Sequence, residues 1–523
     1  MLSDNFKSRV SQLTWEGVLL YAIGVLTLYF TYRFIRKTTL KYKFGVTEAR
    51  LLPKSYPFFS RNPYTFLCLK RDGLVLAEVL KFMRLYGHTW KANLGHQIVV
   101  TADPENIKSI LATQFNDFVM GLRLSQFRPL LGEGVFTLDG HGWKQSRAML
   151  RPNFSREKVA HTQSLEFHVQ NLSKHIRKHN GQPFDIQEYF FRYTVDTSTE
   201  FLFGHSLYGL MDETIGETPP EGSFRGSGNF YESFNISQEI CASRAWAQNL
   251  YYFVNPRNFK ANNKIVHEFA DFYISKALQY DDNVLQDKSK EGYIFLYELV
   301  KETRNPTVLR DQLLNIMIAG RDTTAGLLSM FFFEMSRNPD IFAKLKEEIY
   351  REFGTYDMCD PEDITFESLK KSEYLKWCIN ETLRMYPNVP LNFRCAKRDT
   401  TLPRGGGKDL QQPILIEKGT VVAYIISATH RDPQYYGKDS EVFRPERWGD
   451  KDLKPGWAFL PFNGGPRICL GQQFALTEAS YTIVRLLQMF PNLVNEDKSK
   501  QYPPRIHAQL TLSLTDGAHV RMF

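Results

Sequence analysis

The stretch of sequence that decides the fold reads FNGGPRICLG at residues 462–471, close to the end of the chain. The next eighteen residues, QQFALTEASYTIVRLLQM, have the apolar spacing of a helix. Cys469 therefore stands between a glycine loop and a helix start, where unpaired backbone N–H groups and the helix dipole favour a thiolate. The flanking glycines let the backbone approach a flat ligand closely. Taken alone, the stretch leaves two interpretations open: a thiolate ligand for haem iron, or a buried and inert cysteine.

A second unusual stretch, residues 307–340, reads TVLRDQLLNIMIAGRDTTAGLLSMFFFEMSRNPD. It is apolar nearly all round from Leu313 to Phe333, which predicts a helix buried inside a large core. Its middle, AGRDTT at 319–324, conflicts with that environment. A mid-helix glycine costs about 1 kcal/mol relative to alanine, and a buried carboxylate is costly unless it is paired or neutralised. Such a conflict between sequence levels is typical of a functional site.

The full spacing F-x-x-G-x-R-x-C-x-G, from Phe462 to Gly471, resembles the cytochrome P-450 superfamily of haem-thiolate monooxygenases. The resemblance implies that Cys469 is the axial ligand of the iron of haem b, in a pocket that includes Phe462. The sequence at 319–324 is similar to the family's oxygen-binding helix. By that resemblance, Asp322 and Thr323 deliver protons to bound dioxygen. This role would explain both the glycine and the carboxylate in the middle of the buried helix.

Two further motifs resemble the family's structural supports of the haem pocket. Glu381 and Arg384 match its E-x-x-R pattern, one helical turn apart and able to form an ion pair. Arg447, within FRPERW at 443–448, resembles the third member of that network. A second E-x-x-R, formed by Glu348 and Arg351, does not lead into the Met-Tyr-Pro of residues 385–387, and we expect it to be a surface pair.

Donors for the haem propionates are predicted at four positions. Trp143 and Arg147 form a W-x-x-x-R that resembles the family's propionate helix, and Arg394 and Arg467 resemble two further partners. Indole N–H and guanidinium groups suit carboxylates. For Arg394 an ordinary surface salt bridge stays open as the alternative.

Charge is concentrated near the start of the chain. The 523 residues contain 65 Lys and Arg against 57 Asp and Glu, a net charge of +8. Residues 33–54 hold seven basic residues and one acid, so the excess is one short segment and does not form a nucleic-acid-binding face. Six cysteines without a C-x-x-C speak against a zinc site or a disulfide framework.

The basic segment directly follows sixteen uncharged residues, 17–32. This order predicts a single membrane anchor in residues 1–45, with a helix at about 15–35, because a cleaved signal peptide carries its positive charge before the apolar run. The positive-inside rule places the rest of the chain on the cytosolic face, and we expect the endoplasmic reticulum membrane. The basic flank is expected to meet anionic lipid headgroups. A stretch with Pro53, Pro57 and Pro63 is interpreted as a linker.

By resemblance, residues 46–523 form one haem domain of the cytochrome P-450 fold, mainly α with a small β portion. Short β-type runs at 96–102 and 421–427 supply strand candidates. Six apolar residues could line a substrate channel: Phe115, Phe118, Phe127, Phe136, Val389 and Leu391.

Residues 402–407, LPRGGG, and 134–147 are similar to a fungal branch whose yeast enzymes hydroxylate n-alkanes and fatty acids at the chain end. The resemblance implies dioxygen as co-substrate and electrons from NADPH through a membrane-bound reductase. It also implies a long-chain hydrophobic substrate, membrane lipid as a partner and no nucleic acid. The alternatives are oxidation of a sterol or xenobiotic, a dioxygen-independent haem-thiolate isomerase or dehydratase, and a non-catalytic haem or lipid carrier. The Asp322-Thr323 pair speaks against the isomerase.

Overall fold

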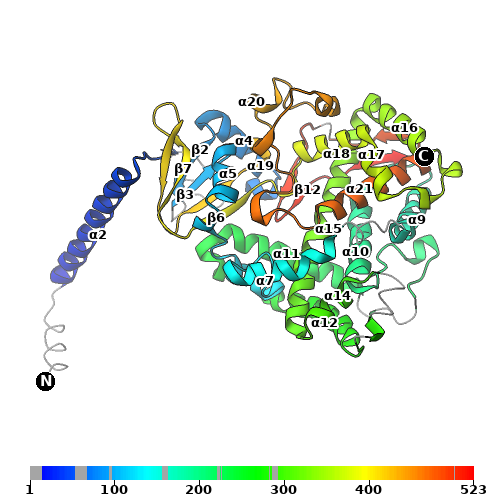
Figure 1. The fold of residues 1–523 in the computed structure, drawn as a ribbon, viewed down its shortest axis with the longest axis horizontal. Coiled ribbons are helices and arrows are strands. Elements are labelled where there is room, and N and C mark those ends of the chain that lie inside the picture. The colour runs from blue at the N-terminus through cyan, green and yellow to red at the C-terminus, as the bar shows by residue number, and fades with distance from the viewer. Residues whose placement is uncertain are drawn as a thin grey trace.

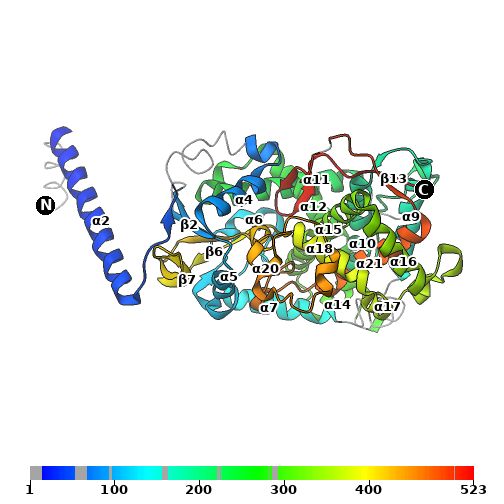
Figure 2. The ribbon, with the colours of Figure 1, turned by 90° about the horizontal axis from the view of Figure 1, so that it is seen from above.

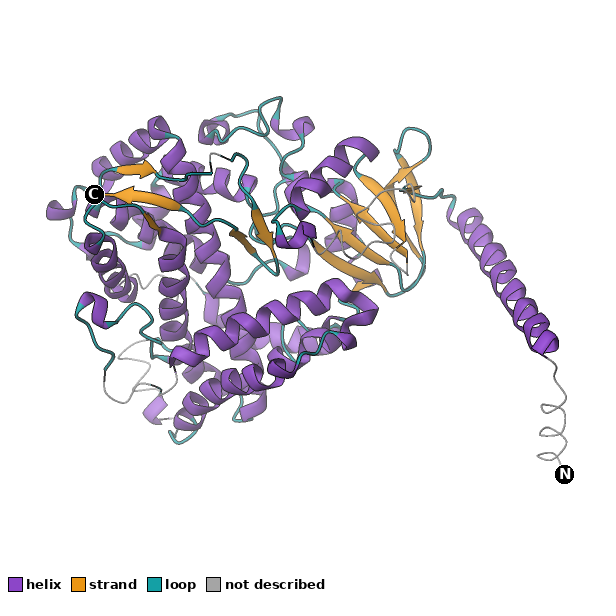
Figure 3. Cartoon of the chain, turned by 180° about the vertical axis from the view of Figure 1, so that it is seen from behind, coloured by secondary structure: helices purple, strands orange, loops and turns teal. Residues whose placement is uncertain are grey.

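The computed structural model describes residues 15–52, 68–93, 97–155, 163–220, 224, 227–281, 283–285, 293–499 and 501–523. Helices make up most of the body; the largest sheet lies at the end next to the N-terminal helix, and smaller strands lie near the C-terminus (Figures 1 and 3). The predicted fold class, mainly α with a small β portion, is confirmed. The predicted linker prolines and the first fourteen residues of the predicted anchor lie outside the described residues.

The helices fall into three groups along the chain. Those before the central helix are α2 (Trp15–Phe44), α4 (Val75–Tyr86), α5 (Pro104–Lys108), α6 (Arg123–Leu131), α7 (Gly140–Leu150), α9 (Gln163–Lys178), α10 (Ile186–Phe203), α11 (Ser227–Ala247), α12 (Arg257–Ala277) and α14 (Phe295–Glu302). The central helix is α15 (Pro306–Arg337). After it come α16 (Pro339–Phe353), α17 (Phe366–Lys371), α18 (Glu373–Met385), α19 (Ile426–Thr429), α20 (Pro433–Tyr436) and α21 (Gln472–Met489).

The largest sheet has the strand order β1-β2-β3-β9-β6-β4. Its strands are β1 (Arg50–Leu51), β2 (Thr89–Asn93), β3 (Gln97–Thr101), β9 (Val421–Tyr424), β6 (Asn392–Ala396) and β4 (Phe118–Val119). Both predicted strand candidates are confirmed as β3 and β9, which pair in parallel. The smaller sheets are β7 (Thr400–Gly406) with β8 (Gln412–Ile416), β11 (Ile506–Ala508) with β12 (Leu512–Leu514), and β10 (Leu493–Asn495) with β13 (His519–Met522) and β5 (Phe184–Asp185).

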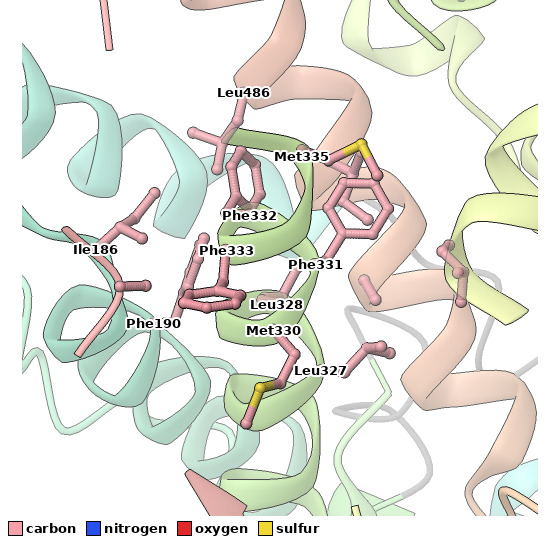
Figure 4. Close-up of a cluster of buried hydrophobic side chains, with 14 of the residues drawn as sticks. Ile186, Phe190, Leu327, Leu328, Met330, Phe331, Phe332, Phe333, Met335 and Leu486 are labelled. Atoms are coloured by element: carbon pink, nitrogen blue, oxygen red, sulfur yellow. The ribbon is translucent and has the colours of Figure 1, made fainter. Parts of the chain in front are cut away.

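Helix α15 passes through the core as its apolar sequence predicts. It begins at Pro306, where the Asn305 side chain accepts hydrogen bonds from the backbone N–H groups of Thr307 and Val308. Its second half is buried on all sides. Figure 4 shows Phe332 and Phe333 of α15 between Phe190 of α10 and Leu486 of α21. A helix surrounded in this way is fixed in position, and it can hold side chains for a site at its middle.

The predicted Glu381–Arg384–Arg447 network lies in the interior. Arg384 donates from Nε and Nη2 to the two oxygens of Glu381 at 2.9 and 2.8 Å. Arg447 Nε donates to Glu381 Oε1 at 2.9 Å, and Trp448 Nε1 donates to Oε2 at 3.1 Å. The carboxylate of Glu381 is thus bonded on both oxygens, which compensates for its burial.

The network connects to the cysteine loop through His430. Arg384 Nη1 donates to the His430 carbonyl at 3.0 Å, and His430 Nε2 accepts from the backbone N–H of Leu460 at 2.7 Å. Burial and the nearby Arg384 charge lower the pKa of His430 to about 3, so the ring stays neutral and Nε2 remains an acceptor. Leu460 lies two residues before Phe462, so the ion pairs position the start of the loop.

The second E-x-x-R departs from the expected surface pair. Glu348 is buried, and its two oxygens accept from the backbone N–H groups of Tyr374 and Leu375, both at 2.8 Å, at the start of α18. Arg351 is exposed and pairs with Glu352 instead. The motif was wrongly interpreted because a helix N-terminus distant in sequence offers Glu348 better donors than Arg351 does.

Helix α2 is long and apolar enough to cross a membrane, and it projects away from the body (Figures 1 and 2). Thirty residues extend about 45 Å, more than the roughly 30 Å of a bilayer's hydrocarbon core. The helix was expected to end near residue 35 but continues through the basic flank to Phe44. The reason is that no glycine or proline interrupts residues 25–44.

The basic end of α2 contacts the body, and not lipid alone as expected. Arg36 pairs with Asp399 at 2.6 Å and with Glu417 at 2.9 Å. Lys37 and Lys41 pair with Glu48 at 2.6 and 3.2 Å. Burial alone would raise the pKa of Glu48, but the hydrogen bonds and charges of Lys37 and Lys91 lower it to about 2. Helix α2 is therefore ion-paired to the body of the protein.

We predict that Arg384→Gln lowers the free energy of unfolding by about 3–5 kcal/mol, because it removes one partner of a buried ion pair. The matched control is Arg351→Gln in the other E-x-x-R, which should cost about 0–1 kcal/mol because its ion pair is exposed. Urea unfolding of the purified proteins, followed by circular dichroism, measures both. Equal losses in the two variants would contradict the structural role of the Glu381 network.

Candidate active site

The loop that carries Cys469 is held in place by backbone contacts. Gly465 has φ +68°, and a Cβ there would lie 1.9 Å from the Leu111 carbonyl oxygen, so only glycine fits. The Cys469 N–H donates to the Phe462 carbonyl at 3.0 Å, which closes the loop. Helix α21 begins three residues after Cys469, with Gly471 at its N-cap. The sequence is thus folded so that the sulfur stands before a helix N-terminus.

The electrostatics of the thiol differ from the expectation. Burial raises the pKa of Cys469, although the Gly471 N–H and the Arg147 charge act to lower it. The predicted N–H contribution is present, but removal of the sulfur from bulk water outweighs it. The protein alone therefore favours the thiol, and a bound metal ion is what would convert it to the thiolate.

Cys469 opens onto a cavity of about 940 Å³. The walls are mostly apolar and come from β1, α6, the α6–α7 connection, α10, α11, α15 and the loop 461–471. Four of the six predicted channel residues line it: Phe127, Phe136, Val389 and Leu391. Phe115 and Phe118 do not. Phe118 belongs to a separate core cluster, and Phe115 packs on the Trp143 ring, because β4 and the turn before it face the sheet.

Helix α15 presents Gly320 and Thr323 to the cavity. The Thr323 hydroxyl donates to the Ala319 carbonyl at 2.7 Å. Asp322 does not line the cavity: its carboxylate accepts from Gln238 of α11 and lies 3.4 Å from Nε of Arg321. The structure therefore brings Thr323 to the site and directs its predicted partner, Asp322, toward a neighbouring helix.

All four predicted propionate donors line the cavity: Trp143 and Arg147 from α7, Arg394 from β6, and Arg467 from the cysteine loop. The Arg467 guanidinium stacks over the Trp143 ring at 4.4 Å and pairs with Asp139 at 2.9 Å. Arg147 Nη2 donates to the Ile468 carbonyl at 2.9 Å. Arg394 is buried, so the alternative of a surface salt bridge is wrong for it.

Sequence reasoning missed a further arginine, Arg123 at the start of α6. Its guanidinium is buried, donates to Asn392 at 2.7 Å, and leaves Nε without a hydrogen-bond partner. Burial and the nearby charge of Arg394 lower the pKa of Arg123 to about 9. The same two causes lower the pKa of Arg467 to about 10. No motif contains Arg123, and it is one of several charged residues between Phe115 and Phe136, so no specific sequence signal pointed to it.

Positive charge in this cavity lacks a negative counterpart. Four arginines line it, and no Asp or Glu does so in the part of the chain that the structure describes. Asp139, just outside, compensates Arg467. Buried charges without partners are strongly unfavourable. The geometry therefore calls for a ligand with carboxylates beside the arginines and a soft-metal centre at Cys469.

Comparison with known proteins agrees with this geometry. The family model described as cytochrome P450 matches residues 57–515.

The chain belongs to the cytochrome P450 family.

It is 54% identical over 503 residues to cytochrome P450 52A12 of Debaryomyces hansenii, covering 95% of this chain and 96% of that protein. It is 54% identical over 520 residues to cytochrome P450 52A4 of Candida maltosa, covering 97% and 96%. With cytochrome P450 52A1 of Candida tropicalis it shares 59% over 500 residues, covering 92% and 90%. As a P450, the protein is a monooxygenase that uses haem iron and dioxygen.

The residues of the cavity fit haem. Haem carries two propionates, and the four arginines that line the cavity, with Asp139 beside Arg467, leave an excess of positive charge that two carboxylates would largely balance. Cys469 supplies a sulfur ligand of the kind that P450 iron takes. A flat ring system also suits a mostly apolar cavity that the glycine-rich loop 462–471 approaches closely.

We predict that Arg123→Gln speeds haem loss at least about tenfold, because a hydrogen bond to a charged group is worth about 1.5–3 kcal/mol. Transfer of haem from the purified enzyme to apomyoglobin measures the rate. The control is Arg128→Gln on the same helix, whose exposed side chain pairs with Glu133 at the surface, and it should lose haem at the wild-type rate. If Arg123→Gln retains haem as wild type does, Arg123 is not a propionate partner.

Proposed function

We propose that this P450 hydroxylates the terminal or near-terminal carbon of n-alkanes and fatty acids. The observation that carries the proposal is the apolar cavity, which extends from Leu51 and Trp90 at the sheet to Cys469. A long hydrocarbon fits such a space, because its walls are mostly apolar. High identity to P450 52A relatives over nearly the whole chain supports the same substrate class, to which residues 402–407 also point.

The proposed haem contacts assign a role to each side chain. Cys469 would supply the sulfur ligand of the haem iron, and Phe462 would form part of the haem pocket. Trp143, Arg147, Arg394 and Arg467, with Arg123, hold the propionates. Bound haem supplies the iron that activates dioxygen, and a thiolate ligand favours O–O cleavage.

Protons for the reaction are proposed to come through α15. Thr323 Oγ1 lines the cavity and can hold and pass a proton there. Asp322 is buried and bonded to Gln238, so it serves as the proton source only after its carboxyl turns from α11 toward Thr323. Hydrocarbon walls exclude bulk water from the rest of the cavity and limit unproductive proton access.

We propose that α2 attaches the protein to a membrane. Residues 1–45 anchor the chain, and residues 46–523 form the haem domain on the cytosolic face of the endoplasmic reticulum. A membrane-bound NADPH–cytochrome P-450 reductase supplies electrons. Leu51, only seven residues after α2 ends, already lines the cavity. The cavity therefore reaches the part of the domain nearest the anchor, where a substrate dissolved in lipid is available.

The test is turnover of microsomes that contain the enzyme and its reductase with dodecane, lauric acid and oleic acid. We expect a terminal or near-terminal alcohol that depends on NADPH and dioxygen, located by mass spectrometry. The Thr323→Ala variant serves as the matched control: NADPH oxidation should continue while product per NADPH falls, because peroxide is released. Absence of terminal and near-terminal product from all three substrates would refute the proposed substrate class.

A further inference from the structure

The connection between α6 and α7, residues 132–139, forms one wall of the cavity. Val135 and Phe136 of this connection line the space, together with Leu131 at the end of α6. Ile316 and Ile318 of α15 line the same space. A connection without regular structure would normally let such side chains move, and the position of a flexible hydrocarbon would then be poorly defined.

Three polar side chains of α15 bond the backbone of this wall. Asn315 Nδ2 donates to the Leu131 carbonyl at 2.9 Å, and Asn315 Oδ1 accepts from the Phe136 N–H at 3.1 Å. Asp311 Oδ2 accepts from the Glu133 N–H at 2.8 Å. Gln312 Nε2 donates to the Glu133 carbonyl at 3.3 Å, and its oxygen accepts from Ser146 of α7 at 2.6 Å. The wall is thus attached directly to the central helix.

Two glycines make this attachment possible. A Cβ at Gly132 would lie 2.1 Å from the Asp311 carboxyl group, and a Cβ at Gly134 would lie 2.4 Å from Asn315 Nδ2. Contacts this short are not tolerated by real side chains, so the backbone approaches α15 only because both positions lack one. Asn315 is fully buried, and its amide has no other function visible in the described structure than to bond this wall and the Asp311 carbonyl.

The opposite edge of the wall is attached to the haem side. Arg467 donates to the carbonyls of Val135 at 3.3 Å and Leu138 at 2.9 Å, and it pairs with Asp139. Residues 132–139 therefore span the distance from α15 to the cysteine loop and are bonded at both ends. Val135 and Phe136 stand between these attachments, so their positions are set relative to both Thr323 and Cys469.

We propose that Asn315 is a positioning residue for regioselectivity: by bonding Leu131 and Phe136 it fixes the wall that determines which carbon of the chain reaches the reacting position. Terminal attack requires that the chain end, and not a neighbouring methylene, occupies that position. A small displacement of a reacting group is enough to change rates strongly. The inference rests on the proposed function, since it concerns the position of attack on a hydrocarbon chain.

The test is Asn315→Leu, which keeps a side chain of similar size but removes both hydrogen bonds to the wall. We expect the ratio of terminal to in-chain alcohol from lauric acid to fall at least about fivefold, with the carbon monoxide spectrum unchanged. Hydrogen exchange of the holoenzyme, followed by mass spectrometry, should show exchange of the peptide containing Phe136 at least about tenfold faster, because its N–H loses its acceptor.

The matched control is Ser329→Ala on the same helix. Ser329 is buried, and its hydroxyl bonds only within α15, to the Ala325 carbonyl at 2.7 Å. It should change neither the product ratio nor the exchange of the Phe136 peptide. Gly134→Ala provides a second variant if Asn315→Leu does not bind haem, because the added methyl displaces the Asn315 amide and should produce the same two changes.

The outcomes separate this inference from the proposed function. Wild-type enzyme without terminal or near-terminal product would contradict the proposed function, and the exchange experiment would still show whether Asn315 holds the wall. Faster exchange with an unchanged product ratio would overturn the role in regioselectivity. Unchanged exchange in both Asn315→Leu and Gly134→Ala would overturn the positioning itself.

Discussion

The buried carboxylate of Glu381 is the interaction on which the site depends. It is bonded by Arg384, Arg447 and Trp448, and Arg384 in turn bonds the carbonyl of His430. His430, held neutral by burial, accepts from Leu460 just before the cysteine loop. The buried carboxylate of Glu381 requires partners. The hydrogen bonds that supply them also hold α18, the turn around Arg447 and the segment that leads into the cysteine loop. The position of Cys469, the proposed iron ligand, thus depends on residues that are not in contact with it.

Helix α15 must satisfy two requirements. It must be apolar where it passes through the core and polar where it faces the site. Its C-terminal half satisfies the first requirement with Phe331, Phe332 and Phe333. Its N-terminal half places Asp311 and Asn315 against the α6–α7 connection, and its middle presents Thr323 to the cavity. One helix therefore contributes to the core, presents the Thr323 hydroxyl proposed to pass protons, and bonds the α6–α7 connection proposed to position the substrate.

Much of the site could be predicted from local patterns, because motif residues near Cys469, Trp143 and Glu381 are positioned mainly by their own loops and helices. The contacts that local patterns did not predict depend on partners distant in sequence. Asp322 turns to Gln238, 84 residues away, and Glu348 bonds the start of α18 instead of Arg351. Arg123 belongs to no motif and gains meaning only when β6 brings Arg394 beside it. Local sequence shows which groups need partners, but not which of several donors the fold will supply.

The excess positive charge near the start of the chain does more than face a membrane. Arg36 and Lys37 bond carboxylates of the domain, so part of the basic segment joins the anchor to the body. Inside the domain, four arginines line the cavity, and among the described residues Asp139 pairs with one of them, Arg467. In both places, the role of each basic side chain depends on the carboxylate that it pairs with and not on the total charge.

The most direct test of Cys469 as the haem ligand is the carbon monoxide difference spectrum of the reduced Cys469→Ala protein. The control is Cys395→Ala. Cys395 lies on β6 beside Arg394 but does not line the cavity. We expect the Soret band of thiolate-ligated haem in the wild type and in Cys395→Ala, and its complete loss in Cys469→Ala. A thiolate-type band that persists in Cys469→Ala would contradict the assignment of the axial ligand and, with it, the cavity as the active site.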